Sequence, residues 1–424
     1  MQKKVSKIFK PLNGAITIPA DKSISHRAVM LGSLANGKSI IKNFSKGEDP
    51  ISTLKIFKNL GVDIQQNGTT IIITSTANLT SPGQPLDCGN SGTTMRLLAG
   101  ILAGKNFNSN LIGDLSLSNR PMKRIIEPLT LMGAKIKSNE YKAPLEITGT
   151  NLHSIEYKSK IASAQVKSCI LLAGLNAEGE TSFQEPYASR NHTEILLKHM
   201  GANLTTFGTT TTIEKSELSP IEIEIPGDIS SAAYFIAGAL TIPNSDIILR
   251  NVGLNPTRTG MLEVVKQMGG DIQILDEHTV CSEPVGDIRI RYSPELKGCK
   301  ISGEIIPKLI DEIPIIAVLA TQANTETTIS DAQDLRNKES DRIQTVVSEL
   351  TKLGAIIKET TDGMKIYPSK LTGGCEVQTY HDHRLAMSFY IAGLISKQEI
   401  LINEFEWANI SFPTFEQLFN TLTK

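Results

Sequence analysis

A helix-like segment that ends at a glycine and continues into a strand occurs five times, about every 70 residues. In each copy an amphipathic stretch precedes the glycine, which suits the left-handed conformation at a helix C-terminus, and an alternating apolar pattern follows it. A sixth such helix, "FEQLFNTL" at residues 415–422, has no glycine after it. A repeat of this kind constrains the fold more than any other feature of the chain. The five glycines are Gly61, Gly133, Gly201, Gly269 and Gly354.

A second element, an apolar helix with a small residue near its end and a β-branched strand after it, alternates with the first and occurs six times. The sequence therefore predicts six units of roughly 70 residues, each with two helices and several strands. Ala-Gly pairs in these helices favour close packing of one helix against another. The small residues are Gly32, Gly100, Gly174, Gly238, Ala320 and Gly393.

Two similar short segments divide the six units into three and three. They are "ITIPADKS" at residues 16–23 and "IEIPGDIS" at residues 223–230. We interpret them as two crossovers between domains. Residues 20–229 would form an N-terminal domain of three units, and residues 1–19 with 230–424 a discontinuous C-terminal domain of three units.

Composition excludes several classes of protein. The formal net charge is −1, whereas a general nucleic-acid or membrane-surface binder would carry a basic excess. The five cysteines are scattered without a CxxC pair, which favours a reduced, cytoplasmic location. No apolar segment of signal-peptide length follows the basic N-terminus, and the most apolar later stretch, residues 305–320, contains two acids and two prolines. We therefore expect no membrane-spanning helix.

The segment "GSLANGKS", from Gly32 to Ser39, matches the phosphate-binding loop pattern GxxxxGK[ST]. That loop needs a strand before it and a helix after it, so that free amides meet the phosphates. Here a helix pattern precedes the segment and a strand pattern follows it. No GxGxxG fingerprint occurs either, so we predict no nucleotide site.

Polar and charged residues gather in the first turn of each apolar helix. Ser, Thr and Asp are expected there because their oxygens accept hydrogen bonds from free backbone N–H groups. Cations need another reason, since each opposes the helix dipole by about 0.3–1 kcal/mol. A bound anion would offset that cost, while a solvated surface position is the alternative for any one of them. The cations that capping does not explain are Lys22, Arg27, Arg96 and Arg384, and Lys167 lies at the opening of the third apolar helix. The other polar residues and the glycine at these openings are Ser23, Asn90, Ser91, Gly92, Thr93, Thr94, Ser163, Gln165, Asp228, Ser230, Ser231, Asp311, Glu312, His381, Asp382 and His383.

Further candidates begin other helices. Arg120 stands just before a proline, and Lys338 and Arg342 share one face of a first turn with Glu339 nearby. A plain ladder of charges four residues apart is the alternative explanation for that pair. Two histidines, at 381 and 383, have no further ligand cluster at suitable spacing, so we predict no metal site. A further helix start carries Ser189 and Arg190.

These motifs, taken in order, resemble the 3-phosphoshikimate 1-carboxyvinyltransferase (EPSP synthase) family. They are "DKSISHR", "GNSGTTMR", "RPM", "SAQVKS", "IDEIP", "NKESDR" and "DHRLAM", and they span nearly the whole chain. The resemblance implies the enolpyruvyl transferase fold, a two-domain inside-out α/β barrel with six βαβαββ repeats, three per domain. In that fold the inner helices direct their N-termini at the cleft between the domains.

The resemblance implies transfer of the enolpyruvyl group of phosphoenolpyruvate to the 5-hydroxyl of shikimate 3-phosphate, with release of phosphate. Asp311 would take the hydroxyl proton, Glu339 would serve the methylene-carbon proton, and Lys22 would assist phosphate departure. No cofactor or metal is implied. The expected partners are small anionic substrates, without nucleic acid or membrane, and we expect a monomer whose domains close on binding.

The resemblance also implies two sets of binding residues. Shikimate 3-phosphate would be held by Lys22, Ser23, Arg27, Ser163, Ala164, Gln165, Asp311 and Lys338. Phosphoenolpyruvate would be held by Lys22, Gly92, Arg120, Gln165, Arg342 and Arg384. The chain departs from the family pattern at Ala164, where a second serine is usual, and at Ile410, where some members have a lysine.

Two other functions stay open. The sister enzyme that transfers enolpyruvyl to a UDP-amino sugar typically has a reactive cysteine in the loop before the arginine that matches Arg120. Here that loop, residues 113–119, reads "GDLSLSN". A non-catalytic repeat scaffold would spread its charges over a solvent face instead of gathering them at helix openings.

Overall fold

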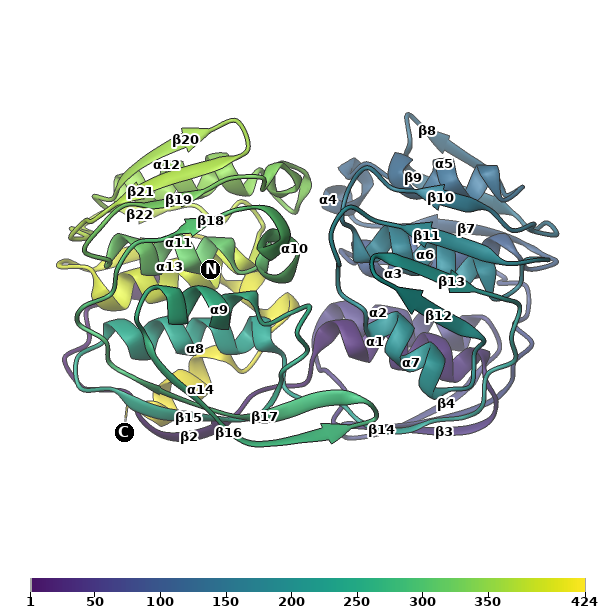
Figure 1. Cartoon of the computed structure of the whole chain (residues 1–424), viewed down its shortest axis with the longest axis horizontal. Helices are drawn as coiled ribbons and strands as arrows, with labels where there is room; N and C mark the ends of the chain where they lie inside the picture. The colour runs from purple at the N-terminus through teal and green to yellow at the C-terminus, as the bar shows by residue number, and fades with distance from the viewer. Residues whose placement is uncertain (1, 424) are drawn as a thin grey trace. The chain divides into compact units, whose positions relative to one another are not determined.

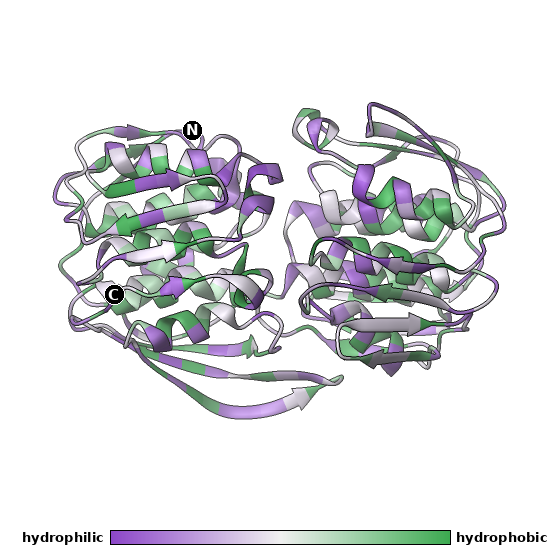
Figure 2. Cartoon of the chain, turned by 45° about the horizontal axis from the view of Figure 1, so that its top comes forward, coloured by the Kyte–Doolittle hydropathy of each residue, from purple (hydrophilic) through white to green (hydrophobic). Residues whose placement is uncertain are grey.

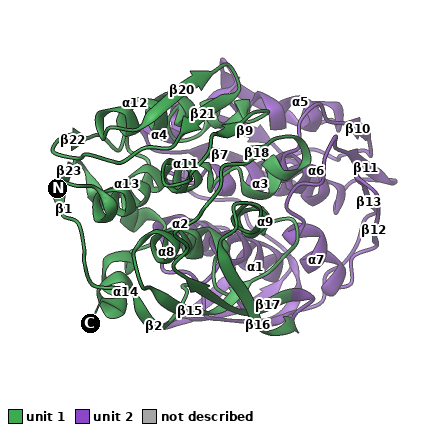
Figure 3. Cartoon of the chain, turned by 60° about the vertical axis from the view of Figure 1, so that its left-hand side comes forward, with its two compact units in different colours: residues 1–19, 226–279, 284–424 green, residues 20–225, 280–283 purple. Residues whose placement is uncertain are grey.

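The computed structural model describes residues 2–423, which divide into two compact units (Figure 3). Of the described residues, unit 1 comprises 2–19, 226–279 and 284–423, and unit 2 comprises 20–225 and 280–283. Each unit has a hydrophobic core of its own. The partition of the chain into an N-terminal domain of residues 20–229 and a discontinuous C-terminal domain stays a prediction. Within the described residues, no helix is long and apolar enough to cross a membrane.

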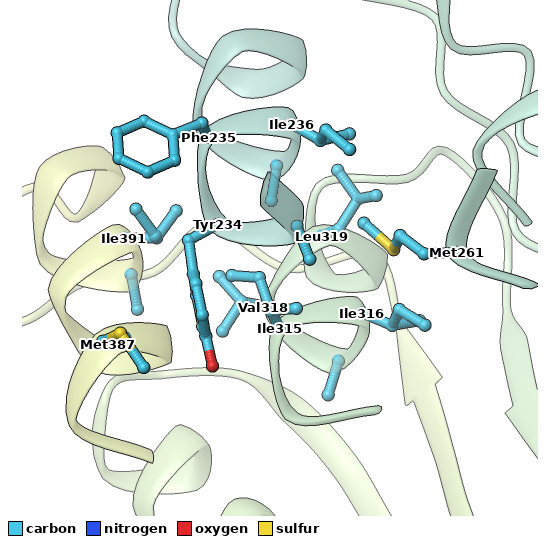
Figure 4. Packing of buried hydrophobic residues seen from close by; sticks show 14 of the residues in the cluster. Tyr234, Phe235, Ile236, Met261, Ile315, Ile316, Val318, Leu319, Met387 and Ile391 are labelled. Atoms are coloured by element: carbon cyan, nitrogen blue, oxygen red, sulfur yellow. The ribbon is translucent and has the colours of Figure 1, made fainter. Parts of the chain in front are cut away.

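Six apolar helices form the centres of the units, three in each. They are buried on nearly all sides, as their uniformly apolar sequences require. Figure 4 shows Tyr234 and Val318 packed between three of these helices in unit 1, and Figure 2 shows hydrophobic residues along the helices of both units. Their positions confirm the six predicted apolar helices. They are α1 (Lys22–Leu34), α3 (Gly92–Ala103) and α6 (Ala164–Gly174) in unit 2, and α8 (Ile229–Thr241), α11 (Ile313–Thr321) and α13 (His383–Ile395) in unit 1.

Five amphipathic helices alternate with the apolar ones, and each ends before a glycine with a φ of 80° to 94°. Only glycine adopts this left-handed conformation without a steric cost, so the repeated glycine is the turn from helix to strand. This confirms the first predicted repeat element. The helices are α2 (Glu48–Asn59), α5 (Lys123–Leu131), α7 (His192–His199), α9 (Gly260–Gln267) and α12 (Arg342–Lys352), and α14 (Phe415–Leu422) is the sixth.

The sheets of unit 2 share one plan. The strand after each apolar helix lies parallel to one neighbour and antiparallel to a hairpin that follows the amphipathic helix. One sheet has the order β14 (Glu222–Glu224), β3 (Asn36–Lys42), β5 (Thr70–Thr76), β4 (Asp63–Asn67). The second has β6 (Leu86–Asp87), β7 (Asn108–Ile112), β9 (Lys142–Thr148), β8 (Lys135–Asn139). The third has β10 (Glu156–Lys158), β11 (Thr181–Gln184), β13 (Thr210–Ile213), β12 (Leu204–Phe207).

Unit 1 repeats the plan (Figure 1), and its third sheet has only three strands among the described residues. Its first sheet has the order β16 (Asp271–Val280), β17 (Glu283–Arg291), β15 (Asp246–Gly253), β2 (Asn13–Thr17). The second has β18 (Lys300–Ile301), β19 (Thr327–Ile329), β21 (Gly363–Tyr367), β20 (Ile356–Thr360). The third has β1 (Lys3–Val5), β23 (Ile400–Ile402), β22 (Glu376–Val377). The six small sheets match the six predicted repeats.

Two strands are exchanged at the crossover segments. Strand β2 directly precedes α1 in the sequence but pairs in parallel with β15, whereas β14 directly precedes α8 but pairs in parallel with β3. The exchanged strand satisfies the backbone hydrogen bonds of a sheet edge that would otherwise stay open. Each crossover segment thus runs from a sheet in one unit to an apolar helix in the other.

Short helices lie next to several candidate residues. The helix α4 precedes Arg120, η2 precedes Lys338, and η3 ends at Ile410, whose side chain is buried. These elements are α4 (Leu115–Asn119), α10 (Ile306–Leu309), and the 3₁₀ helices η1 (Gly303–Ile305), η2 (Gln333–Asn337) and η3 (Phe405–Ile410).

The small residues of the apolar helices serve both helix-to-helix and helix-to-sheet packing, so the predicted helix-to-helix role holds for only some of them. A Cβ atom at Gly100 would lie 2.2 Å from the carbonyl oxygen of Cys169 on α6, so this glycine does bring two helices together. At Gly32 and Gly174 the nearest atoms instead belong to side chains of the unit's sheets, at 3.2 Å and 2.7 Å. At these two positions the small residue makes room for the sheet that covers the helix.

Candidate active site

The opening of α1 holds two cations in different surroundings. Asp21 caps the helix by accepting a hydrogen bond from the backbone N–H of Ile24 at 2.8 Å. Lys22 Nζ lies 3.1 Å from Asp49 Oδ2, and 18% of the lysine side chain is exposed. The Lys22 amine is therefore ion-paired, and the side chain that carries it is not fully buried.

Arg27 is buried and held by hydroxyl and carbonyl oxygens. Its Nε donates to Thr193 Oγ1 at 2.6 Å, and its Nη2 donates to Ser168 Oγ at 2.9 Å. Its Nη1 donates to the backbone oxygen of Ser23 at 3.0 Å. These three contacts fix the guanidinium beneath the first turn of α1.

Two guanidinium groups flank the first residue of α3. A Cβ atom at Gly92 would lie 2.7 Å from Arg96 Nη1 and 3.4 Å from Arg120 Nη1. Arg120 Nη2 also donates to Asn90 Oδ1 at 2.8 Å. Both arginines are buried, and the free N–H groups of the helix end add to their positive field. This arrangement suits a phosphate or carboxylate group.

The opening of α6 lies next to these arginines and is half-buried. Gln165 Oε1 accepts from Arg96 Nη1 at 2.6 Å, and its Nε2 donates to Thr93 Oγ1 at 3.2 Å. Ser163 is the N-cap residue of α6, but its side chain makes no capping hydrogen bond. Ser163 and Ala164 are both half-buried, so the hydroxyl of Ser163 can reach a ligand.

Lys167, one of the cations at the helix openings, serves the interior of unit 2. Its Nζ lies 2.7 Å from a carboxylate oxygen of Glu185 and 2.7 Å from one of Glu194, with only 4% of its side chain exposed. Burial lowers the pKa of Lys167, but the charges of Glu194 and Glu185 outweigh that effect and hold the pKa above its ordinary value. Ser189 donates to Glu185 as well, so both candidates belong to a structural ion-pair cluster.

Arg342 is the centre of the charged cluster in unit 1. Its Nε and Nη2 lie 2.7 Å and 3.2 Å from the two carboxylate oxygens of Asp382, and Nη2 lies 2.6 Å from Glu339 Oε2. Its Nη1 lies 3.3 Å from Asp311 Oδ1. Burial by itself would lower the pKa of Arg342. The charges of Asp382, Glu339 and Asp311 outweigh burial and hold the pKa above its ordinary value, so the side chain stays charged.

Asp311 lies among three cations. Its carboxylate oxygens are 3.4 Å from Lys338 Nζ, 3.3 Å from Arg342 Nη1 and 3.9 Å from Arg384 Nη2. The neighbouring Glu312 is buried, accepts a short hydrogen bond from the hydroxyl of Ser230, and lies 3.5 Å from Arg384 Nη1. Unit 1 thus holds two carboxylates, Asp311 and Glu339, beside cations that can bind an anion.

The segment before α13 is strained. Tyr380 and His381 have φ angles of 52° and 59°, in the left-handed region that residues with a Cβ rarely adopt. His381 stacks on Trp407 at 4.7 Å between ring centroids and lies 3.2 Å from Glu404, while Asp382 caps α13. No group of three or more His, Cys, Asp or Glu side chains that could hold a metal ion occurs within residues 2–423.

Sequence reasoning missed several residues of the two clusters. Asp49 and Thr193 lie in the first turns of the amphipathic helices α2 and α7. Arg258 donates to Ser230 Oγ at 2.6 Å and precedes α9 as Arg120 precedes α5. Alignment of the amphipathic helices across the repeats would have found all three.

The chain is similar to one family over nearly its full length. The family model described as EPSP synthase (3-phosphoshikimate 1-carboxyvinyltransferase) matches residues 6–419. The 3-phosphoshikimate 1-carboxyvinyltransferase of Bacillus licheniformis is 51% identical over 411 residues, which cover 95% of this chain and 96% of that protein. That of Thermoanaerobacter sp. is 50% identical over 414 residues, which cover 97% of this chain and 98% of that protein.

Solved structures agree with the sequence comparison. The EPSP synthase of Acinetobacter baumannii has a TM-score of 0.88 and 42% identity, and the match covers 99% of this chain and 98% of that one. The enolpyruvyl transferase NikO of Streptomyces tendae has a TM-score of 0.80 at 15% identity, a likeness of fold. The fold is therefore the predicted enolpyruvyl transferase fold, and the chain belongs to the EPSP synthase (3-phosphoshikimate 1-carboxyvinyltransferase) family.

Proposed function

We propose that the chain transfers the enolpyruvyl group of phosphoenolpyruvate to the 5-hydroxyl of shikimate 3-phosphate and releases phosphate, as a transferase of the shikimate pathway of aromatic amino-acid biosynthesis. The observation that carries the proposal is the pair of guanidinium groups, Arg96 and Arg120, at the N-terminus of α3. Both substrates are polyanions, and such a site binds anions by charge and by directed N–H groups together.

The binding residues in unit 2 are assigned to the two substrates, and Lys22 and Gln165 are assigned to both. Phosphoenolpyruvate would be held by Lys22, the α3 N-terminus at Gly92, Arg120 and Gln165. Shikimate 3-phosphate would be held by Lys22 and by Ser23, Arg27, Ser163, Ala164 and Gln165. At Ala164 only the backbone N–H is available, because its side chain has no polar atom.

The binding residues in unit 1 are cations now paired with carboxylates. Lys338 would contact shikimate 3-phosphate, and Arg342 and Arg384 would contact phosphoenolpyruvate. Each already lies within 4 Å of a carboxylate oxygen of Asp311. A substrate anion would join an existing network of charges, so the side chains need little reorganisation on binding.

The reaction needs proton transfers, and two carboxylates are suited to them. The bond from the 5-oxygen to C2 of the enolpyruvyl group forms, the bond from C2 to the phosphate oxygen breaks, and Asp311 takes the hydroxyl proton. Glu339 gives a proton to the methylene carbon and later takes one back, which restores the double bond. Lys22 neutralises the departing phosphate.

The proposed residues come from both units, so a complete site needs both to contact the same substrates. We propose that the units are domains that close around the substrates, because bound polyanions relieve the mutual repulsion of the cations that surround them. Solution X-ray scattering tests this: saturating shikimate 3-phosphate with a phosphoenolpyruvate analogue should reduce the radius of gyration. An unchanged scattering curve under proven saturation would contradict closure.

The decisive experiment is phosphate release by the purified protein with three sets of substrates. Release is expected with phosphoenolpyruvate plus shikimate 3-phosphate, and not with phosphoenolpyruvate plus a UDP-amino sugar or without an acceptor. Release with the UDP-amino sugar would support the sister activity, and no release from a protein folded by circular dichroism would favour a scaffold. A cytoplasmic location and a monomeric state are further proposals, which rest on the scattered cysteines and on the family resemblance.

A further inference from the structure

A chain of buried hydrogen bonds in unit 2 joins three helices and is not used by the proposed reaction. His26 Nδ1 on α1 lies 2.7 Å from Thr53 Oγ1 on α2, which lies 2.7 Å from Thr94 Oγ1 on α3. Thr94 Oγ1 donates to Ser91 Oγ at 2.7 Å. All four side chains are at most 1% exposed.

The direction of the chain follows from the number of protons. The single hydroxyl proton of Thr94 goes to Ser91, so the Thr94 oxygen accepts from Thr53. Thr53 has then used its own proton, and its oxygen accepts from His26 Nδ1, which also lies 3.5 Å from Thr94 Oγ1. The ring of His26 therefore carries its proton on Nδ1, while Nε2 has no hydrogen-bond partner among the described residues.

The surroundings of His26 keep the ring neutral. Burial and the nearby charges of Lys22 and Arg27 hold the pKa of His26 well below 6.5. A neutral ring with one proton gives the chain one direction at physiological pH, which a charged ring with two donors would not.

The chain of hydrogen bonds ends at Ser91, the residue that precedes the proposed anion site. Ser91 caps α3 by accepting from the Thr94 backbone N–H at 3.1 Å, and Gly92 follows it directly beside Arg96 and Arg120. A shift of Ser91 would therefore move the first N–H groups of α3 relative to both guanidinium groups.

We infer that His26, Thr53 and Thr94 are positioning residues for the phosphoenolpyruvate site: their directed hydrogen bonds fix Ser91 and with it the N-terminus of α3. The inference rests on the proposed function for the identity of the anion. None of the three residues contacts the substrate, so their loss should weaken binding of phosphoenolpyruvate while the chemical step and the other substrate are little affected.

Thr53→Val tests the inference, because valine has nearly the shape of threonine and removes only the relay oxygen. We expect the KM for phosphoenolpyruvate to rise about tenfold, which corresponds to about 1.4 kcal/mol of binding free energy. The kcat and the KM for shikimate 3-phosphate should stay within about twofold of the unchanged enzyme. Thr53→Ser, which keeps the oxygen, should restore the original KM.

A double substitution tests whether the residues act in series. Thr94→Val breaks the same chain, so Thr53→Val with Thr94→Val should raise the KM no more than the larger single change. Thr181→Val is the matched control, because Thr181 is a buried threonine of unit 2 whose hydroxyl has no partner among the described residues. It should leave all three constants unchanged.

The ¹⁵N chemical shifts of His26 give a second readout that does not depend on turnover. They should report the Nδ1–H tautomer, and Thr53→Val should change them. An active enzyme whose KM for phosphoenolpyruvate is unaffected by Thr53→Val overturns the inference, as does the Nε2–H tautomer. Absence of turnover in the unchanged protein would instead overturn the proposed function, and the tautomer would still test the hydrogen-bond chain.

Discussion

Replacing Asp382 with asparagine removes the carboxylate charge that holds Arg342 in the interior of unit 1. Both side chains are almost completely buried, at 0% and 1% exposed, and two hydrogen bonds of 2.7 Å and 3.2 Å join them. Breaking a buried ion pair at one partner costs about 3–5 kcal/mol. Arg342 keeps Glu339 at 2.6 Å and Asp311 at 3.3 Å, and asparagine can still cap α13, so we expect about 3 kcal/mol, the lower end of that range.

Differential scanning calorimetry measures this effect. For a unit of about 200 residues, 3 kcal/mol corresponds to a fall in Tm of roughly 6–12 °C. The matched control is Asp341→Asn. Asp341 also caps a helix, and its carboxylate lies 2.8 Å from the guanidinium group of Arg336. However, the side chains of Asp341 and Arg336 are each 28% exposed. A partly exposed pair is screened by solvent and contributes about 0–1 kcal/mol, so this variant should lose at most about 4 °C. Equal shifts for the two variants would refute the reasoning that burial sets the cost.

Three further predictions concern activity and pH. Asp311→Asn and Glu339→Gln should each lower kcat by about 10²–10⁴-fold with little change in either KM, because each removes a titrating group and keeps its shape; stopped-flow phosphate release measures this, and near-normal kcat would move the proton transfers to other groups. Arg120→Ala should weaken use of phosphoenolpyruvate at least about 30-fold, since losing one partner of a buried charge pair costs about 2–5 kcal/mol, while Lys38→Ala, at an exposed position of strand β3, should have almost no effect. A large loss with Lys38→Ala would revive the nucleotide site. Below pH 6.5 the unfolded chain takes up a proton that buried His26 does not, because its pKa is lowered in the folded state, so stability falls as the pH falls, by up to about 1.4 kcal/mol per pH unit. Urea unfolding at pH 7.0 and 5.5 should show this loss in the unchanged protein and not in His26→Asn, and equal pH dependence would refute it.

The sequence by itself determined the repeat and the place of the polar helix openings. A glycine that follows an amphipathic stretch ends a helix for a local reason, since only glycine enters the left-handed region freely. The glycine can therefore be recognised in the sequence at each turn from an amphipathic helix to a strand. The same holds for Asp21 and Asp228, whose side chains cap the helix that directly follows them. It also holds for the helix-then-strand order around Lys38, which excluded the phosphate-binding loop.

The tertiary structure alone decided which charges meet. Arg27 donates to Thr193, 166 positions away, and Arg342 pairs with Asp382, 40 positions away. Lys167 has the same place at a helix opening as the candidate cations, yet two glutamates from other elements make it structural.

The exchange of β2 and β14 between the sheets could not be predicted from the sequence either. The alternating pattern of a strand specifies which of its faces is buried, but not which strand pairs with it. A residue's local sequence fixes its backbone conformation and its direction from the helix axis. Its partners across the core depend on how distant elements pack, and that information is spread over the whole chain.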